Sequence, residues 1–443
     1  MISIKKNSSF RLFLIYFTYQ TLWFFGLPIA ILYLYLRGAR DRMYKETIRE
    51  RFGKYEISLN ECVWIHAVSL GEVRSAEPLV RRLIANNEKI VMTHITPAGK
   101  RAASNLFKNE IQNGLVFSVF APLDFGNYIK RFIRNFNPKY TLIMEVEFWP
   151  SIIQVHYKKK IPLLLCNGQY PHHSFIRNQK KFFSAHPFLK NFYAVLVKSE
   201  THAKRFQKAG VINTSTTGEL RFDQSIPKKF IKASNKILNN KNKNLSVVLF
   251  SSVVYDEEDL FITLIDKILN TINPDDCPTF IIVPRAPERF DIVANKLALK
   301  GIKFLRRSQS LDSNLNGELF SKHNVILGDS LGEMYFYTNL ADVVIIGGGF
   351  GRLGSHGISE PLSLLKPTII GENDSIISYI SEDAIKYGVV QRMNLTELRD
   401  FLLRKEYIFT SMHNIQDYIA KNKGATVRTL AAINKFVGTN YEL

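Results

Sequence analysis

Short runs of hydrophobic residues recur along the chain and alternate with stretches whose apolar positions follow a helical period. The runs of the first half are CVWIHAV (62–68), KIVMTHI (89–95), LVFSVFA (115–121), YTLIMEV (140–146), PLLLCN (162–167) and AVLVKS (194–199). A second series comprises SVVLFSS (246–252), TFIIVPR (279–285), NVILGD (324–329), DVVIIGGG (342–349) and PTIIGE (367–372). Continuous apolar strands between amphipathic helices are typical of a parallel sheet that helices cover on both faces. The pattern predicts two Rossmann-like α/β domains.

The N-terminal segment from Leu12 to Leu36 carries no charged residue and exceeds the roughly 20 residues that cross the core of a bilayer. Its length predicts a single membrane anchor, while its aromatic residues and Pro28 also suit a helix in the headgroup region. A buried core helix is the alternative. Basic residues follow the segment at Arg37, Arg40, Arg42, Lys45, Arg49 and Arg51. The positive-inside bias therefore places the bulk of the chain in the cytoplasm, with this basic neck on anionic headgroups.

A polar segment rich in Asn and Lys, residues 224–244, separates the two series of apolar runs and has the composition of a connection between domains. We expect a membrane anchor and basic neck over residues 1–45, a first Rossmann-like domain over 46–230 and a second over 231–443. Ligands of open parallel sheets bind beyond the carboxyl ends of the strands. The two domains are therefore predicted to face a cleft that holds the substrates.

The 443-residue chain carries a formal net charge of +20 at pH 7, so its surface attracts polyanions such as nucleic acid, an anionic bilayer or a phosphorylated substrate. The basic neck accounts for part of this excess, and the sequence contains no recognised nucleic-acid-binding module. We expect no nucleic-acid partner. Cys62, Cys166 and Cys277 lie far apart, which indicates neither a zinc site nor a disulfide framework and favours a reducing compartment.

The segment WIHAVSLGEV (64–73) contains a predicted strand that ends near Ser69 and a helix that begins near Glu72. Glu72 therefore lies at a strand-to-helix turn that faces the predicted cleft. The helix dipole favours a carboxylate there, and a capping role is the commoner one for such a residue. As a general base, Glu72 would accept the proton of an attacking hydroxyl group.

Charged residues also stand near the ends of two later strands. In IMEVEFWPS (143–151), Glu145 and Glu147 lie two residues apart and would share one side of the strand if the strand persisted. Two such carboxylates repel each other unless a cation or substrate hydroxyl groups separate them, and exposed edge residues are the alternative. In TGELRFDQ (217–224), Arg221 is placed to face an anion, although a solvated arginine is the commoner case.

The second half presents an arginine at the end of a predicted strand. In IIVPRAPERF (281–290) the strand terminates at Pro284, because proline fixes the backbone and removes an amide donor. Arg285 is thereby held at the carboxyl edge of the sheet, where its planar guanidinium suits a phosphate or a carboxylate. We interpret Arg285 as an anion-binding residue.

A glycine-rich loop follows the predicted strand at 342–349. GFGRLG (349–354) fits the GxGxxG pattern of dinucleotide sites, but residues 355–357 intervene before Ser359, which has the sequence context of a helix cap. We therefore expect a longer loop whose backbone amides point at a donor phosphate. Glu360, at the start of the helix, is placed to accept hydrogen bonds from ribose hydroxyl groups.

The order and spacing of these motifs resemble the 3-deoxy-D-manno-octulosonic acid (Kdo) transferases of lipopolysaccharide synthesis, over nearly the whole chain. These are glycosyltransferase-B enzymes, so the resemblance implies two Rossmann-like domains facing a cleft, with an N-terminal membrane-anchor helix. The SxGE motif of the family carries its general base and is matched at Glu72. The ETE-WP and NLKFD motifs are matched by EVEFWP (145–150) and ELRFD (219–223), in which Arg221 replaces the family's lysine.

These matches imply the residues of the active site. Glu72 is implied to be the base, and a glutamate of the first motif (Glu145 or Glu147) and Arg221 are implied to stabilise the transition state. The implied contacts to the nucleotide of the donor are Pro284, Arg285, Leu331, Gly332, Glu333, Gly357, Ile358, Ser359 and Glu360. Departures such as Ala286, which stands where the family has a histidine, mark a divergent member.

The resemblance implies an inverting glycosyltransferase that moves Kdo from its CMP-activated form to the lipid A precursor, lipid IVA. The first domain would bind this acceptor and the second the CMP-sugar donor, and no metal ion or other cofactor is expected. The enzyme would lie on the cytoplasmic face of the inner membrane, whose anionic surface is a further expected partner. The alternatives are a glycosyltransferase-B enzyme with another sugar nucleotide or acceptor, and a non-catalytic membrane-bound paralogue.

Overall fold

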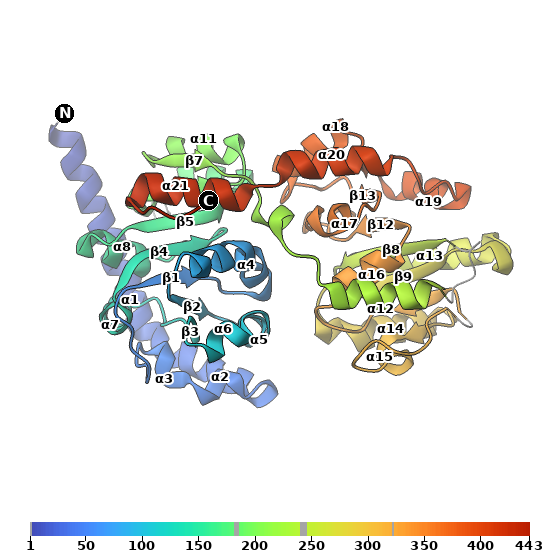
Figure 1. The fold of residues 1–443 in the computed structure, drawn as a ribbon, viewed down its shortest axis with the longest axis horizontal. Coiled ribbons are helices and arrows are strands. Elements are labelled where there is room, and N and C mark those ends of the chain that lie inside the picture. The colour runs from blue at the N-terminus through green and yellow to red at the C-terminus, as the bar shows by residue number, and fades with distance from the viewer. Residues whose placement is uncertain (1, 181–185, 240–245, 321–322) are drawn as a thin grey trace. The chain divides into compact units, whose positions relative to one another are not determined.

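The chain folds into two compact units, which a computed structural model describes over residues 2–180, 186–239, 246–320 and 323–443. Unit 1 comprises Met1–Gln224 together with Gly424–Leu443, and unit 2 comprises Ser225–Lys423. Each unit contains one seven-stranded parallel sheet with helices packed against it (Figure 1). The prediction of two Rossmann-like α/β domains is confirmed.

The sheet of unit 1 has the strand order β3-β2-β1-β4-β5-β6-β7. Its strands are β1 (Cys62–His66), β2 (Ile90–His94), β3 (Val116–Phe120), β4 (Pro138–Met144), β5 (Leu163–Gly168), β6 (Ala194–Val197) and β7 (Thr214–Thr216). Alternate residues of one strand enter different cores, since Val63 and Ile65 of β1 pack in one apolar cluster and Cys62 and Trp64 in another. Burial on both faces explains why the strands have continuous apolar sequences rather than alternating ones.

Helices cover both faces of this sheet. They are α1 (Ile2–Arg40), α2 (Met43–Glu46), α3 (Ile48–Arg51), α4 (Leu70–Ala85), α5 (Pro97–Leu106), α6 (Lys108–Gln112), α7 (Gly126–Phe136), α8 (Pro150–Lys159), α9 (His172–Lys180), α10 (His186–Leu189), α11 (Glu200–Lys208), the 3-10 helix η1 (Leu220–Asp223) and α21 (Ala425–Val437). Several begin at a side-chain cap, as where the hydroxyl of Thr96 accepts a hydrogen bond from Gly99 N at the start of α5.

The last helix, α21, belongs to unit 1 although it follows unit 2 in the sequence. Ala425, Leu430 and Ile433 are buried in the same apolar cluster as β1 and α4. The carboxylate of Asp223 accepts hydrogen bonds from Gly424 N at 2.7 Å and Thr426 N at 2.6 Å. The final 20 residues therefore lie apart from the rest of the segment predicted as the second domain, because an apolar face and a capping carboxylate draw them to unit 1.

Helix α1 is the one helix in the described part of the chain with the length and composition to cross a membrane, over Phe10–Ala39. One of its faces packs on unit 1, where Ile15 and Leu34 are buried, and other positions expose large side chains such as Phe13 and Ile29. Hydrogen bonds of Tyr19 and Gln20, here called the polar joint, hold the middle of α1 on the rest of unit 1. Tyr19 donates a hydrogen bond to the buried Asp124 at 2.8 Å, and Gln20 accepts one from Gly126 N and donates one to Ser151.

The same joint reaches the start of α8. The Asp124 carboxylate accepts hydrogen bonds from Ser151 N and Ile152 N at 2.9 and 3.0 Å, at the first turn of the helix. Burial raises the pKa of Asp124 to about 6, although these hydrogen bonds lower it in part. Asp124 therefore links α1 to the helix that begins directly after Trp149.

Unit 2 has a sheet of order β10-β11-β9-β8-β12-β13-β14. Its strands are β8 (Val247–Val253), β9 (Thr279–Pro284), β10 (Leu305–Arg306), β11 (Val325–Leu327), β12 (Val343–Ile346), β13 (Thr368–Ile370) and β14 (Val390–Arg392). Its helices are α12 (Lys228–Asn239), α13 (Glu258–Thr271), η2 (Pro274–Asp276), η3 (Pro287–Arg289), α14 (Phe290–Leu299), α15 (Arg307–Ser310), α16 (Met334–Leu340), α17 (Ser359–Ser363), α18 (Ser378–Lys386), α19 (Leu395–Arg404) and α20 (Met412–Asn422).

Helix α12 occupies much of the segment predicted as a polar connection. Phe230, Ser234 and Ile237 recur at helical spacing and are buried, and α12 packs against α16. Two well-spaced apolar residues are thus enough to dock a helix that is otherwise basic. Residues 240–244 of the predicted connection lie outside the described residues.

Candidate active site

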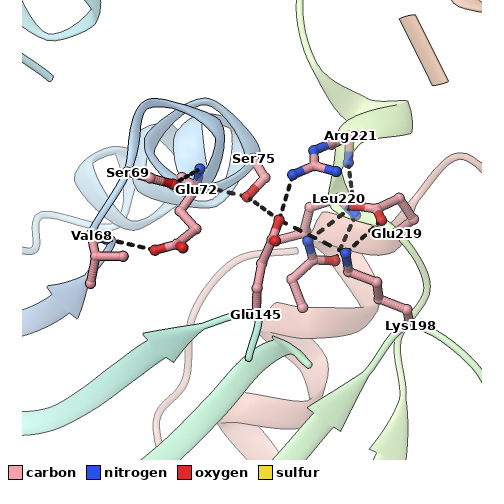
Figure 2. Close-up of polar contacts among 10 residues, drawn as sticks. Val68, Ser69, Glu72, Ser75, Glu145, Lys198, Glu219, Leu220 and Arg221 are labelled. Carbon is pink, nitrogen blue, oxygen red and sulfur yellow. Dashed lines mark hydrogen bonds and ion pairs between the residues drawn. The ribbon is translucent and has the colours of Figure 1, made fainter. Parts of the chain in front are cut away.

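Charged side chains converge at the carboxyl edge of the unit 1 sheet (Figure 2). They stand after the ends of β1, β4, β6 and β7, and the polar Asn167 of β5 lies between β4 and β6 in the strand order. The carboxyl ends of parallel strands meet at one edge, so residues that are distant in sequence come together there. Three of the predicted site residues, Glu72, Glu145 and Arg221, lie in this group.

Glu72 stands in the first turn of α4, whose N-cap is Ser69. Its backbone N lies 3.4 Å from the hydroxyl oxygen of Ser69, and its carboxylate accepts a hydrogen bond from Val68 N at 2.6 Å. The residue thus has the capping contacts that its sequence position favours. Burial, with a smaller contribution from the carboxylates of Glu147 and Glu145, raises its pKa to about 8. Its carboxyl group can therefore exchange a proton close to neutral pH.

Glu145 and Glu147 do not share one side of a strand. β4 ends at Met144, and Glu145 has the left-handed φ of 61°, which turns the chain before Glu147. The Glu145 carboxylate pairs with Arg221, whereas Glu147 accepts a hydrogen bond from Trp149 Nε1 at 2.7 Å. Burial is the main cause that raises the pKa of Glu147. The condition under which the two carboxylates would share one side, a strand that continues through both, is not met, because β4 ends at Met144.

Arg221 lies in η1, the short helix that follows β7, and its Nη2 is 2.6 Å from Glu145 Oε1. Two polar residues of this group were not among the predicted site residues: Lys198, directly after β6, contacts Glu145 and Glu219, and Asn167, near the end of β5, donates a hydrogen bond to Glu219. Both are polar residues at the end of an apolar run, AVLVKS and PLLLCN. A polar residue at the end of an apolar run is the pattern that placed Arg285 at the edge of its sheet. The same pattern could have placed Lys198 and Asn167 at the edge of the unit 1 sheet.

The predicted donor residues all lie in unit 2. Pro284 is the last residue of β9, and Arg285 follows it as an exposed residue whose N donates a hydrogen bond to the carbonyl of Val253 at 2.9 Å. Arg289, one turn later, is bidentate to the buried Glu258 at 2.8 and 2.6 Å. Arg289 of this motif therefore has a structural carboxylate partner.

Three backbone amides of the glycine-rich loop are already bound within the chain. Glu257 accepts hydrogen bonds from Gly348 N at 2.6 Å and Phe350 N at 2.7 Å, and Asp256 accepts one from Arg352 N at 2.8 Å. These three alternate amides bind carboxylates of the chain itself. For these three amides the expectation of a donor phosphate is wrong, because Asp256 and Glu257 already accept their hydrogen bonds. For the amides of residues 357–360 it stays a prediction.

Close packing accounts for glycine at the centre of the loop. A Cβ at Gly349 would clash with the hydroxyl of Ser355 and the backbone of Gly371, and a Cβ at Gly371 would clash with Gly349. The GxGxxG pattern therefore reflects a tight approach between the loop and the end of β13. It gives no indication of a dinucleotide site.

The other donor candidates form two groups. Leu331 is exposed and Gly332 has a φ of 86°, while both carboxylate oxygens of Glu333 lie 2.7 Å from the buried Arg307. Gly357 is exposed and Glu360 half-buried at the start of α17, whereas the side chain of Ile358 is buried. Ser359 is the first residue of α17.

Solved structures show the fold of the chain independently. A glycosyltransferase from Rickettsia africae superposes with a TM-score of 0.53 at 12% identity, covering 87% of this chain and all of that one. The UDP-GlcNAc 2-epimerase from Neisseria meningitidis gives 0.54 at 11% identity, covering 85% of this chain. These similarities establish a glycosyltransferase-B-like fold.

Relatives in sequence are more specific. The family model of the 3-deoxy-D-manno-octulosonic-acid transferase (kdotransferase) matches residues 46–224. The 3-deoxy-D-manno-octulosonic acid transferase of Bordetella pertussis is 29% identical over 381 residues, which cover 85% of this chain and 87% of the relative. A probable mitochondrial enzyme of the same name from Arabidopsis thaliana is 30% identical over 410 residues, 88% of each chain. The chain therefore belongs to the 3-deoxy-D-manno-octulosonic acid transferase family and is a glycosyltransferase.

Proposed function

We propose that the chain transfers Kdo from CMP-Kdo to the lipid A precursor, lipid IVA, with inversion at the anomeric carbon. The observation that carries this proposal is the buried carboxyl group of Glu72, with a pKa of about 8, next to the ion pair of Glu145 and Arg221. Membership of the Kdo transferase family supports the identity of the sugar. The proposal includes no metal ion or other cofactor.

In the proposed reaction, a hydroxyl oxygen of the acceptor forms a bond to the anomeric carbon while the bond from that carbon to the phosphate of CMP breaks. Glu72 takes the proton of the hydroxyl group, and CMP leaves as an anion. A base with a pKa near the working pH combines sufficient ionisation with good proton affinity. Arg221 would stabilise negative charge as the bond to phosphate breaks.

The nearby carboxylates adjust the base in this scheme. Glu145 and Glu147 both raise the pKa of Glu72, so they make it a stronger base than an ordinary glutamate. Since Glu72 must be ionised to act, we expect kcat to rise with pH up to about 8 and then to level off. A pH profile of kcat measured with saturating donor and acceptor checks this expectation.

Unit 2 is proposed to bind CMP-Kdo, with Arg285 on the phosphate and Glu360 on the ribose. Pro284, Leu331, Gly332, Gly357, Ile358 and Ser359 are proposed to contribute their backbone or shape to this site. We expect Glu333 to act through Arg307, because both of its oxygens contact that guanidinium. The exposed Arg285 is the residue on which anion binding depends most directly in this proposal.

The proposal is tested with full-length protein in membranes, CMP-Kdo and the tetraacylated precursor, with the product masses as the readout. Glu72→Gln should abolish transfer while calorimetry still detects CMP binding. Arg285→Ala should instead weaken CMP binding, and the matched control Arg399→Ala, an exposed arginine paired with Asp400, should not. Unchanged turnover of Glu72→Gln would remove Glu72 from its role.

Two other outcomes would favour the competing functions. Release of CMP only with another sugar nucleotide, or with another acceptor, would indicate a different glycosyltransferase-B activity. A protein that binds no CMP and transfers no sugar from any nucleotide donor tested would be a non-catalytic paralogue. Either result would overturn the proposed substrate pair without affecting the assignment to the family.

We also propose that α1 holds the protein on the cytoplasmic face of the inner membrane. Its exposed phenylalanines and the basic residues that follow it, including Arg37 and Arg42, suit an anionic lipid surface. Flotation with vesicles tests this. Binding should require α1 and should weaken when anionic lipid is replaced by neutral lipid.

A further inference from the structure

Lys198 is an almost fully buried cation at the carboxyl edge of the unit 1 sheet, and the proposed reaction gives it no role. Its side chain is 1% exposed, and its Nζ lies 2.9 Å from Glu219 Oε2 and 3.8 Å from Glu145 Oε1 (Figure 2). A buried ammonium group is costly unless it is paired. The position of Lys198 therefore depends on these two carboxylates, and at 1% exposure it is shielded from a substrate.

Glu219 shapes the backbone that carries Arg221. Its side chain is 5% exposed, its Oε1 accepts a hydrogen bond from Asn167 Nδ2 at 3.0 Å, and the same oxygen lies 3.3 Å from Arg221 N. Asn167 in turn accepts a hydrogen bond from Leu220 N at 3.1 Å. Glu219 and Asn167 together thus fix the first residues of η1.

Glu145 holds the other end of Arg221. Its Oε1 lies 2.6 Å from Arg221 Nη2 and 3.4 Å from the hydroxyl of Ser75. Figure 2 shows both contacts. Lys198 lies closer to Glu219 than to Glu145. Its Nζ is 2.9 Å from Glu219 Oε2 and 3.8 Å from Glu145 Oε1, a difference of 0.9 Å. Each carboxylate therefore has its own nearest cation.

We propose that Lys198 is a positioning residue for the transfer reaction, which neutralises Glu219 so that the Arg221 guanidinium stays on Glu145. Without Lys198, the negative charge of Glu219 would draw Arg221, whose own backbone it already contacts, away from Glu145. Without Glu219, Lys198 would turn to Glu145 and compete with Arg221 there. Lys198 and Glu219 therefore act as a unit, and either residue alone misplaces Arg221.

This inference rests on the proposed function, because Arg221 matters there as the group that stabilises negative charge. The test compares Lys198→Met, Glu219→Gln and the double variant in the membrane assay. A displacement of about 1 Å in an active site costs on the order of 100-fold in rate, so each single variant should lower kcat by about that factor. The KM for CMP-Kdo should stay within about twofold, because the proposed donor residues lie in unit 2.

The double variant should recover to within about tenfold of the wild-type kcat, because it removes both buried charges and leaves the pair of Glu145 and Arg221 intact. Lys208→Met, which removes an exposed lysine of α11, is the matched control and should have wild-type kcat. The kcat values are corrected for the folded fraction, measured by thermal melting. A purely structural role would lower the melting temperature of the single variants and leave the corrected kcat unchanged.

Several outcomes would overturn the inference. One is a corrected kcat of Lys198→Met within about threefold of the wild type, and another is a double variant no better than the single ones. If Lys198→Met does not fold, the double variant decides, and a loss as large as that of Arg221→Ala would contradict the proposal. Failure of the wild-type protein to transfer Kdo would instead overturn the proposed function, so the two failures remain distinct.

Discussion

Replacing Glu72 by Gln is expected to make the protein more stable at neutral pH while it abolishes transfer. The carboxyl group is buried, and its pKa is raised from the ordinary value of 4.5 to about 8. Glutamine has nearly the same shape and keeps an oxygen that can accept the hydrogen bond from Val68 N. It lacks the charge, which is the feature that the folded protein disfavours at this position.

The magnitude follows from the two pKa values. Below about pH 4.5 the group is protonated in both the folded and the unfolded chain and contributes nothing. As the pH rises toward 8, the unfolded chain loses the proton and the folded chain keeps it, so folding becomes less favourable by about 1.4 kcal/mol per pH unit. The free energy of unfolding is thereby lowered by about 3 kcal/mol at pH 7 and by about 5 kcal/mol above pH 8.

Thermal melting of both proteins between about pH 5 and pH 9 measures this difference. For a unit of this size, about 3 kcal/mol corresponds to an increase of roughly 6 to 12 °C in the melting temperature of unit 1 at pH 7. The advantage of the variant should grow up to pH 8 and then stay constant. Glu200→Gln is the matched control, since Glu200 also stands in the first turn of a helix but is exposed. A difference that is independent of pH, or a variant less stable than the wild type, would refute the reasoning.

Two further predictions concern buried carboxylates that hold backbone amides. Asp124→Ala leaves Ser151 N, Ile152 N and the Tyr19 hydroxyl without their acceptor. It should lower the free energy of unfolding, measured by denaturant titration, by about 3 kcal/mol or more. An unchanged midpoint would contradict a stabilising role of these hydrogen bonds. In Glu257→Gln, the side chain can accept only one of the two amide hydrogen bonds of the glycine-rich loop. The Kd for CMP, measured by calorimetry, should rise about tenfold. Unchanged affinity would show that the loop is not linked to the donor site.

Most strands could be predicted because parallel strands buried on both faces leave continuous apolar runs. The runs at 62–68 and 115–121 contain β1 and β3 with errors of one or two residues at their ends. β7, β10 and β14 were not predicted, since TST (214–216), LR (305–306) and VQR (390–392) are short and polar. The sheet position of such strands comes from pairing with a neighbour, which a local pattern does not contain.

A site residue was predictable where its position along its own strand or helix is enough to place it at the edge of the sheet. Glu72 follows from a strand that ends and a helix that begins, and Arg285 from a proline that terminates a strand. The partners of these residues were not predictable in the same way. The pair of Lys198 and Glu219 joins two neighbouring strand ends, and the capture of Gly348 by Glu257 joins residues about 90 positions apart.

Helix α1 shows a similar limit. Its composition indicates a membrane segment, and the structure agrees in length and in the apolar character of its exposed positions. The sequence of Tyr19 and Gln20 did not reveal that both hydrogen-bond to unit 1. A buried carboxylate at Asp124 makes that joint costly to open, because it would leave polar groups without partners. The apolar helix is therefore also an integral part of unit 1.

The chain has a net charge of +20, yet many of its carboxylates stabilise the structure from within. Those described above are turned inward, onto amides or cations of the chain: Glu72 on Val68 N, Asp124 on Ser151 N, Asp223 on Gly424 N, Glu219 on Lys198, Asp256 on Arg352 N and Glu257 on Gly348 N. A carboxylate engaged in this way contributes little negative potential to the surface around it. The positive charges of exposed residues then dominate the potential at the surface, which suits the phosphate-bearing substrates proposed above.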